Sequence, residues 1–234
     1  MKKLFSLLFV ISSFTLLGCQ KSSVSYKSVD NLDEYYADDK VAAAISKLSE
    51  SNTFSLNLEQ SYSGFYYKVI FNADNDYYYE YGCLDVNVES EQYTDTYHGL
   101  YTNKTFYSMS NDKQELLTGE EALDEFTKFT AQTRTRLLYG IMDPFWIMGD
   151  TVKEGAQLKY YVGSDKTLKI TISNETNNLN GTAIIDSETL LLKKLSCKYD
   201  AKINANESVT VNNLMSSSYS CPKHKTLKDI GWKE

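Results

Sequence analysis

Most of the chain alternates apolar and polar residues with a period of two, and this pattern constrains the fold more than any other feature. Between residues 54 and 59, for example, Phe, Leu and Leu alternate with Ser, Asn and Glu. Successive side chains of a β-strand point to opposite faces, so the pattern predicts a strand with one buried and one solvated face. We expect further strands at residues 66–71, 77–88, 99–102, 105–109, 158–162, 168–173, 182–186, 190–199 and 208–219.

Two stretches replace this alternation with a helical period. In residues 33–49 the apolar positions recur at spacings of three and four, which places four side chains on one helix face: Val41, Ala44, Ile45 and Leu48. The second helix is predicted at residues 120–139, and its start is marked by Thr118 and Glu121, whose spacing is that of a capping box. In this second helix we expect the core to be contacted by Leu123, Phe126 and Leu137.

An apolar segment follows the second helix and is interrupted by Pro144, which a helix interior does not tolerate. It contains Phe145, Trp146, Ile147 and Met148. Two interpretations stay open: these side chains fill the core, or they border an apolar ligand pocket. The pocket hypothesis places seven residues around one cavity: Leu123, Phe126, Leu137, Phe145, Trp146, Ile147 and Met148.

The N-terminus has the features of an export signal. Lys2 and Lys3 precede 14 uncharged residues, and this run is shorter than the roughly 20 apolar residues of a transmembrane helix. The sequence Leu-Leu-Gly-Cys that ends at Cys19 resembles the lipobox of bacterial lipoproteins. We therefore predict a signal peptide at residues 1–18, lipid attachment at Cys19 and a polar tether at residues 19–29. The mature protein would be held on the extracytoplasmic side of the cell membrane.

Charge and cysteine content narrow the function classes. The formal net charge is −7, and removal of residues 1–18, which carry two lysines and no acid, takes it to −9. An acidic chain repels phosphate backbones, so nucleic acid is not an expected partner. Cys83, Cys197 and Cys221 remain beside Cys19. In an oxidising compartment they could form one disulfide, or all three could stay as free thiols.

No motif in the sequence indicates catalysis. The only two histidines, His98 and His224, lie far apart in the chain and outside any metal-binding spacing, and no nucleophile elbow or phosphate-binding loop is present. We therefore expect a non-enzymatic protein without a metal or cofactor. Tyrosine is abundant, with 19 residues. The runs at residues 66–67 and 77–81 either pack within strands or form an aromatic platform for a sugar.

The order of elements resembles the LolA/LppX-type lipoprotein carriers: a helix, successive antiparallel strands, a helix with an apolar loop, then further strands. The segment from Gly181 to Thr189, a strand that leads into a turn, carries the same resemblance. It spans about residues 30–221, as a single domain followed by a charged tail at residues 222–234. The resemblance implies an α+β fold in which a strongly curved antiparallel sheet forms an incomplete β-barrel, with helices on its concave face.

Two functions follow as expectations. The resemblance implies that a hydrophobic or amphiphilic, lipid-like ligand binds between the sheet and the helices. The alternative is an envelope module that binds protein or glycan through exposed Tyr-rich strands and has no ligand cavity. A cavity in the structure would favour the first, and a filled core with an exposed aromatic patch would favour the second.

Overall fold

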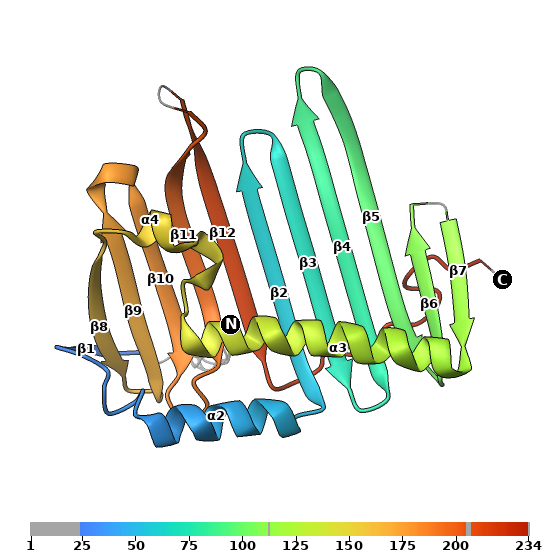
Figure 1. The fold of residues 1–234 in the computed structure, drawn as a ribbon, viewed down its shortest axis with the longest axis horizontal. Helices are drawn as coiled ribbons and strands as arrows, with labels where there is room; N and C mark the ends of the chain where they lie inside the picture. The colour runs from blue at the N-terminus through green and yellow to red at the C-terminus, as the bar shows by residue number, and fades with distance from the viewer. Residues whose placement is uncertain (1–23, 112, 205–206, 234) are drawn as a thin grey trace, which may run out of the picture.

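The computed structural model describes residues 24–111, 113–204 and 207–233, so the predicted signal peptide and Cys19 lie outside the described residues. Its main feature is one 12-stranded antiparallel sheet (Figure 1). The strands are β1 (Tyr26–Val29), β2 (Thr53–Tyr62), β3 (Phe65–Asp74), β4 (Tyr77–Val88), β5 (Glu91–Thr102), β6 (Thr105–Ser110), β7 (Lys113–Thr118), β8 (Gln157–Gly163), β9 (Thr167–Asn174), β10 (Leu179–Asp186), β11 (Leu192–Lys202) and β12 (Ser208–Ser218).

The sheet is built from two runs of hairpin-connected strands. Its order is β1-β8-β9-β10-β11-β12-β2-β3-β4-β5-β6-β7, so the pairing of β12 with β2 joins the two runs. β1 and β7 lie at opposite edges, and the sheet is therefore not closed into a barrel. This arrangement, with helices on one face, confirms the predicted α+β class.

The helices all lie on one side of the sheet, which we call the helix face (Figure 1). α2 (Asp38–Glu50) and α3 (Gly119–Met142) match the two predicted helical stretches, and α4 (Asp150–Lys153) is a short addition. α3 runs across the strands instead of along them. The predicted capping box does not form, because the Thr118 side chain accepts no hydrogen bond at the start of α3.

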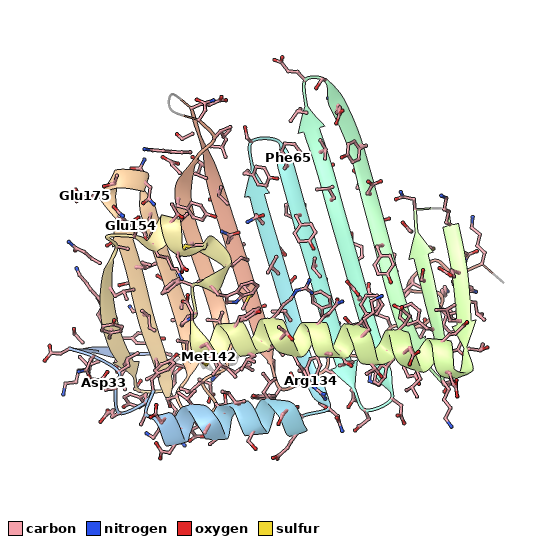
Figure 2. All side chains as sticks on the ribbon, in the orientation of Figure 1. Asp33, Phe65, Arg134, Met142, Glu154 and Glu175 are labelled. Atoms are coloured by element: carbon pink, nitrogen blue, oxygen red, sulfur yellow. The ribbon has the colours of Figure 1, made fainter. Side chains whose placement is uncertain are left out.

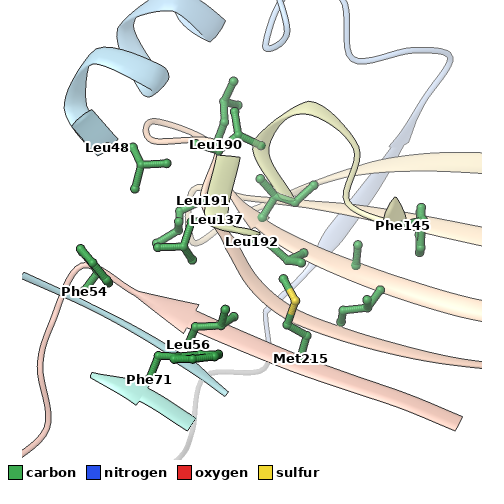
Figure 3. Close-up of a cluster of buried hydrophobic side chains, with 14 of the residues drawn as sticks. Leu48, Phe54, Leu56, Phe71, Leu137, Phe145, Leu190, Leu191, Leu192 and Met215 are labelled. Carbon is green, nitrogen blue, oxygen red and sulfur yellow. The ribbon is translucent and has the colours of Figure 1, made fainter. Parts of the chain in front are cut away.

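The core lies between α3, α2 and the sheet. In the N-terminal half of α3, Phe129 stacks between Tyr78 and Phe106, with ring centroids 5.9 and 5.6 Å away. In the C-terminal half, Leu137 is 1% exposed and packs in an aliphatic cluster that includes Leu192 (Figure 3). This packing fixes the position along the strands at which α3 crosses the sheet.

The structure corrects one of the predicted core contacts. Leu123 is 51% exposed, so it does not face the core, whereas Phe126 stacks on Tyr101 with ring centroids 4.4 Å apart. The reason is that α3 crosses the sheet as a straight rod, and position 123 falls on its solvent side. The helical spacing of apolar residues did not predict which side of α3 would face the sheet.

Two predicted boundaries also change. Tyr26–Val29 forms β1 and pairs with β8, so the last four residues of the predicted tether belong to the sheet. The predicted charged tail folds against the sheet, where Ile230 is 1% exposed. Leu227, Ile230 and Trp232 contact residues of β4–β6 such as Tyr107. The sequence did not indicate these contacts, because the three apolar residues lie among charged ones.

Candidate functional site

α3 leaves much of the helix face uncovered. β4 and β5 have 12 residues each, which is about 40 Å of strand, whereas a helix is only about 10 Å wide. The far ends of β2–β5 therefore extend well beyond α3, as the position of Phe65 shows (Figure 2). A hollow of about 370 Å³ lies in this region. We call it the open trough. Its floor includes Tyr67, Val69, Glu80, Gly82, Leu84 and Tyr97, and its remaining lining residues are Cys83, Asp95, Thr96, Ser110 and Asn111.

Strand register explains why the trough is hollow. Gly82 on β4 lies opposite Val69 on β3 and Tyr97 on β5. Because Gly82 has no side chain, the middle strand contributes only backbone between two larger neighbours. A Cβ atom added at this position would meet nothing closer than the Tyr97 Cβ, at 3.9 Å. The trough is therefore open at Gly82, and a larger side chain there would fill it without displacing the sheet.

A polar end completes the trough next to α3. Burial raises the pKa of the Glu80 carboxyl to about 7, and the nearby charge of Arg136 opposes this shift. The Glu80 Oε2 atom is buried and has no hydrogen-bond partner among the residues that the structure describes. The Arg136 guanidinium lies 4.7 Å from the centroid of the Phe71 ring. Near neutral pH, this end therefore combines a partly protonated carboxyl with a cation.

This arrangement suits a molecule with two chemically different ends. Tyr67, Val69, Leu84 and Tyr97 offer an apolar surface, and Tyr67 is 38% exposed. Glu80 and Arg136 offer hydrogen-bonding and charged groups at the α3 end. Ligand sites are mostly apolar with a few placed polar groups, and the volume lies within the usual range of about 300–1,000 Å³.

The seven residues of the predicted pocket do not surround one cavity. Phe126 lines a hollow beside Arg134, and Phe145 lines a different one of about 270 Å³ beside Leu32 and Tyr160. Leu137 and Met148 are buried in the core, and Trp146 and Ile147 are half-buried against it. The exposed Leu123 lies apart from them.

The apolar segment after α3 thus packs as core. Phe145 is 3% exposed, and its ring lies 3.3 Å from the position that a Cβ on Gly181 would occupy. Glycine on β10 therefore makes room for the ring. Residues Trp146–Met148 form the short 3-10 helix η1, which carries the chain away from Pro144. The sequence did not predict the trough. Gly82 and Glu80 are ordinary strand residues until the strand register shows which side chains lie beside them.

Other candidate groups have structural partners. His98 lies near Tyr79, and burial lowers its pKa. Cys83, Cys197 and Cys221 are free thiols, and burial raises the pKa of Cys197 and of Cys221 to about 11, which makes both poor nucleophiles. Within residues 24–233 as described, no group of three or more His, Cys, Asp or Glu is arranged to hold a metal ion. None of the described helices has the length and hydrophobicity of a membrane span.

Comparisons with known proteins give weak likenesses. No family model and no curated protein matches the chain. Among solved structures, it is similar to LprF from Mycobacterium bovis, with 12% identity and a TM-score of 0.29, over 78% of this chain and 91% of that chain. It is also similar to a DUF1329 family protein from Desulfovibrio piger, with 11% identity and a TM-score of 0.21, over 88% and 98% of the two chains. Scores this low identify neither a family nor a ligand, and the fold assignment rests on the sheet topology.

Proposed function

We propose that this protein is a non-enzymatic, membrane-anchored extracytoplasmic lipoprotein that binds an amphiphilic, lipid-like ligand in the open trough. The observation that supports it is a hollow in which apolar side chains adjoin the buried Glu80 carboxyl, with the Arg136 cation close to that carboxyl. This binding site differs from the one expected from the sequence, because core side chains fill the space between α3 and the sheet. The ligand would lie on the uncovered part of the helix face, with its polar group toward α3.

The energetics favour an acyl chain on this floor. Removal of apolar surface from water contributes about 25 cal/mol per Å², so burial of about 200 Å² would contribute about 5 kcal/mol before the costs of association. Gly82 allows the chain to approach the sheet backbone closely. The polar end then fixes the direction of the ligand, since an acyl chain placed over Glu80 would leave a buried carboxyl without a partner.

Membrane anchoring belongs to the same proposal. Its support is the charge, length and Leu-Leu-Gly-Cys ending of residues 1–19. β1 begins at Tyr26, so the chain between Cys19 and the sheet reaches at most about 25 Å. A Cys19→Ala variant is expected to lose fatty-acid labelling and leave the membrane fraction. Retention of the label in this variant would place the anchor elsewhere.

The trough is tested by filling it. In a form that begins at residue 20, Gly82→Leu is expected to weaken the binding of a fluorescent fatty-acid analogue by at least about ten-fold. The matched control is Thr171→Leu, which adds the same side chain to β9 on the other side of the sheet. Equal affinity of all three proteins would exclude the trough as the binding site, and a wild type that binds no probe at micromolar concentration would exclude the function.

A further inference from the structure

A second hollow lies on the side of the sheet away from α2, α3 and α4, which we call the opposite face. Its volume is about 810 Å³, more than twice that of the open trough. Strand register aligns five of its lining residues in one row across β12, β2, β3, β4 and β5: Ser216, Asn57, Ile70, Tyr81 and His98. We call this hollow the opposite-face groove. The row is polar at its β12 end and aromatic at its β5 end.

The polar half of the groove requires a ligand that forms hydrogen bonds. A second row beside the first adds Ser55 and Asn72 to its lining. The Oδ1 atom of Asn57 is buried and has no partner among the described residues. Amides and hydroxyls covered by an apolar ligand would each cost about 1–3 kcal/mol, because their hydrogen bonds to water would not be replaced.

The aromatic half supplies ring surface. The Tyr81 and His98 rings have centroids 5.0 Å apart and are inclined at 47°, so they form two sides of a corner. Beneath them, the Tyr79 hydroxyl lies 3.3 Å from His98 Nδ1. Burial lowers the pKa of His98, so its ring is neutral near pH 7. A neutral corner of this kind offers flat apolar surfaces together with groups that donate and accept hydrogen bonds.

The C-terminal segment forms a fixed rim. Pro222 and Lys225 line the groove, and the Lys225 amide donates to the Tyr77 hydroxyl at 2.8 Å. The His224 ring stacks on Tyr77 with centroids 3.9 Å apart, and its Nε2 lies 3.1 Å from the Asp74 carboxylate. These contacts, all within the chain, fix the rim to β3 and β4. The site is therefore pre-organised, which lowers the entropic cost of binding.

We infer that the opposite-face groove binds an oligosaccharide. A sugar chain presents many hydroxyls, which would supply hydrogen-bond partners for the Oδ1 atom of Asn57 and for the polar groups of Asn72 and Ser55. It also presents apolar ring faces, which suit Tyr81 and His98. Two lysines line the groove, and Lys68 is paired with Glu59 at 2.7 Å. The groove therefore suits a neutral sugar, and Lys225 supplies a cation for an acidic one. This site has separate residues and a separate ligand class from those of the open trough.

The experiment uses the full-length protein in phosphatidylcholine nanodiscs and three probes: cellotetraose, the tetramer of N-acetylglucosamine, and tetragalacturonic acid. Calorimetric titration is expected to detect binding of at least one probe. Tyr81→Ala and Asn57→Ala are each expected to weaken that binding by about ten-fold or more. Tyr93→Ala serves as the matched control, because it removes an exposed tyrosine from the helix face.

The outcomes separate this inference from the proposed function. Gly82→Leu is expected to leave sugar binding unchanged, since Gly82 faces the open trough. If Tyr81→Ala lowers the melting temperature, Asn57→Ala decides, because it removes a polar group that contributes little to packing. Binding of no probe at about 10 mM, or binding that both groove variants leave unchanged, would overturn the inference. Sugar binding that Gly82→Leu abolishes would also overturn it, since the sugar would then occupy the trough.

Discussion

The two faces of the sheet differ in how they are covered, and β4 shows the difference within one strand. Its even-numbered residues Tyr78, Glu80 and Gly82 lie on the helix face, where Tyr78 is buried under α3 and the other two line the trough. Its odd-numbered residues Tyr79 and Tyr81 lie on the opposite face, beside the C-terminal segment. One strand therefore contributes to a core and to two hollows. What differs between the faces is the covering element: a long helix on one and a short irregular segment on the other.

The covering elements should also differ in how much they stabilise the fold. The helix-face core extends from α2 through α3 to β10 and β11, whereas the opposite face has a cluster with four buried members: Tyr77, Tyr79, Leu100 and Ile230. A large shared core couples its parts into one cooperative unit, and a small peripheral cluster can open locally. We therefore expect mutations in the helix-face core to lower global stability strongly, and mutations in the opposite-face cluster to cause local opening with a smaller loss of global stability.

The largest expected effect is that of Leu137→Ala in the helix-face core. This substitution leaves a cavity under α3, and the free energy of unfolding should fall by about 2–5 kcal/mol in chemical denaturation. The control is Leu123→Ala on the exposed side of the same helix, with an expected change within about 0.5 kcal/mol. Similar losses for both variants would mean that α3 does not pack as described.

A smaller effect is expected at Glu80, and it depends on pH. The pKa of this carboxyl is raised to about 7 from an unfolded value of 4.5, so the folded state binds a proton more tightly. Stability should therefore fall as the pH rises from about 4.5 to about 7, by about 1–3 kcal/mol. Glu80→Gln should remove this fall and stabilise the protein at pH 8 but not at pH 4. A pH profile of unfolding that the variant shares with the wild type would show that Glu80 titrates normally.

The smallest expected effect on global stability is that of Ile230→Ala, at about 1 kcal/mol. Because Ile230 holds only the C-terminal segment, its truncation should release that segment while the sheet stays folded. Hydrogen exchange should accelerate at the Lys225 amide, which donates to Tyr77, and stay slow in β10 and β11. Acceleration throughout the sheet would show that the segment belongs to the main cooperative unit.

Sequence patterns predicted the strands well where one face is buried. The range predicted for β4, residues 77–88, is the one observed. The predicted strands 99–102 and 105–109 are joined by a hairpin that turns at Asn103 and Lys104, with φ of 51° and 60°. β7 was missed, because most of its residues are exposed and it lacks alternation. The first two-thirds of β5, residues 91–98, was missed because most of these residues are exposed.

The candidate sites were much less predictable than the strands. For the Tyr-rich run at residues 77–81 the sequence leaves two alternatives, packing within strands or an aromatic platform, and the alternation along β4 places its members on two different faces. Gly82 and Asn57 gave no signal, since their role depends on which residues the neighbouring strands place beside them. The apolar segment at residues 145–148 attracted attention through composition. Its Phe145 ring lies close to Gly181 on β10, a neighbour that no local pattern reveals.

The central claim is that the uncovered part of the helix face holds an amphiphile. The most direct measurement is mass spectrometry of small molecules extracted from the purified form that begins at residue 20, compared among wild type, Gly82→Leu and Thr171→Leu. We predict one lipid class that co-purifies with the wild type and with Thr171→Leu, and that is depleted from Gly82→Leu. Equal lipid content in all three proteins, or none in any, would contradict the claim.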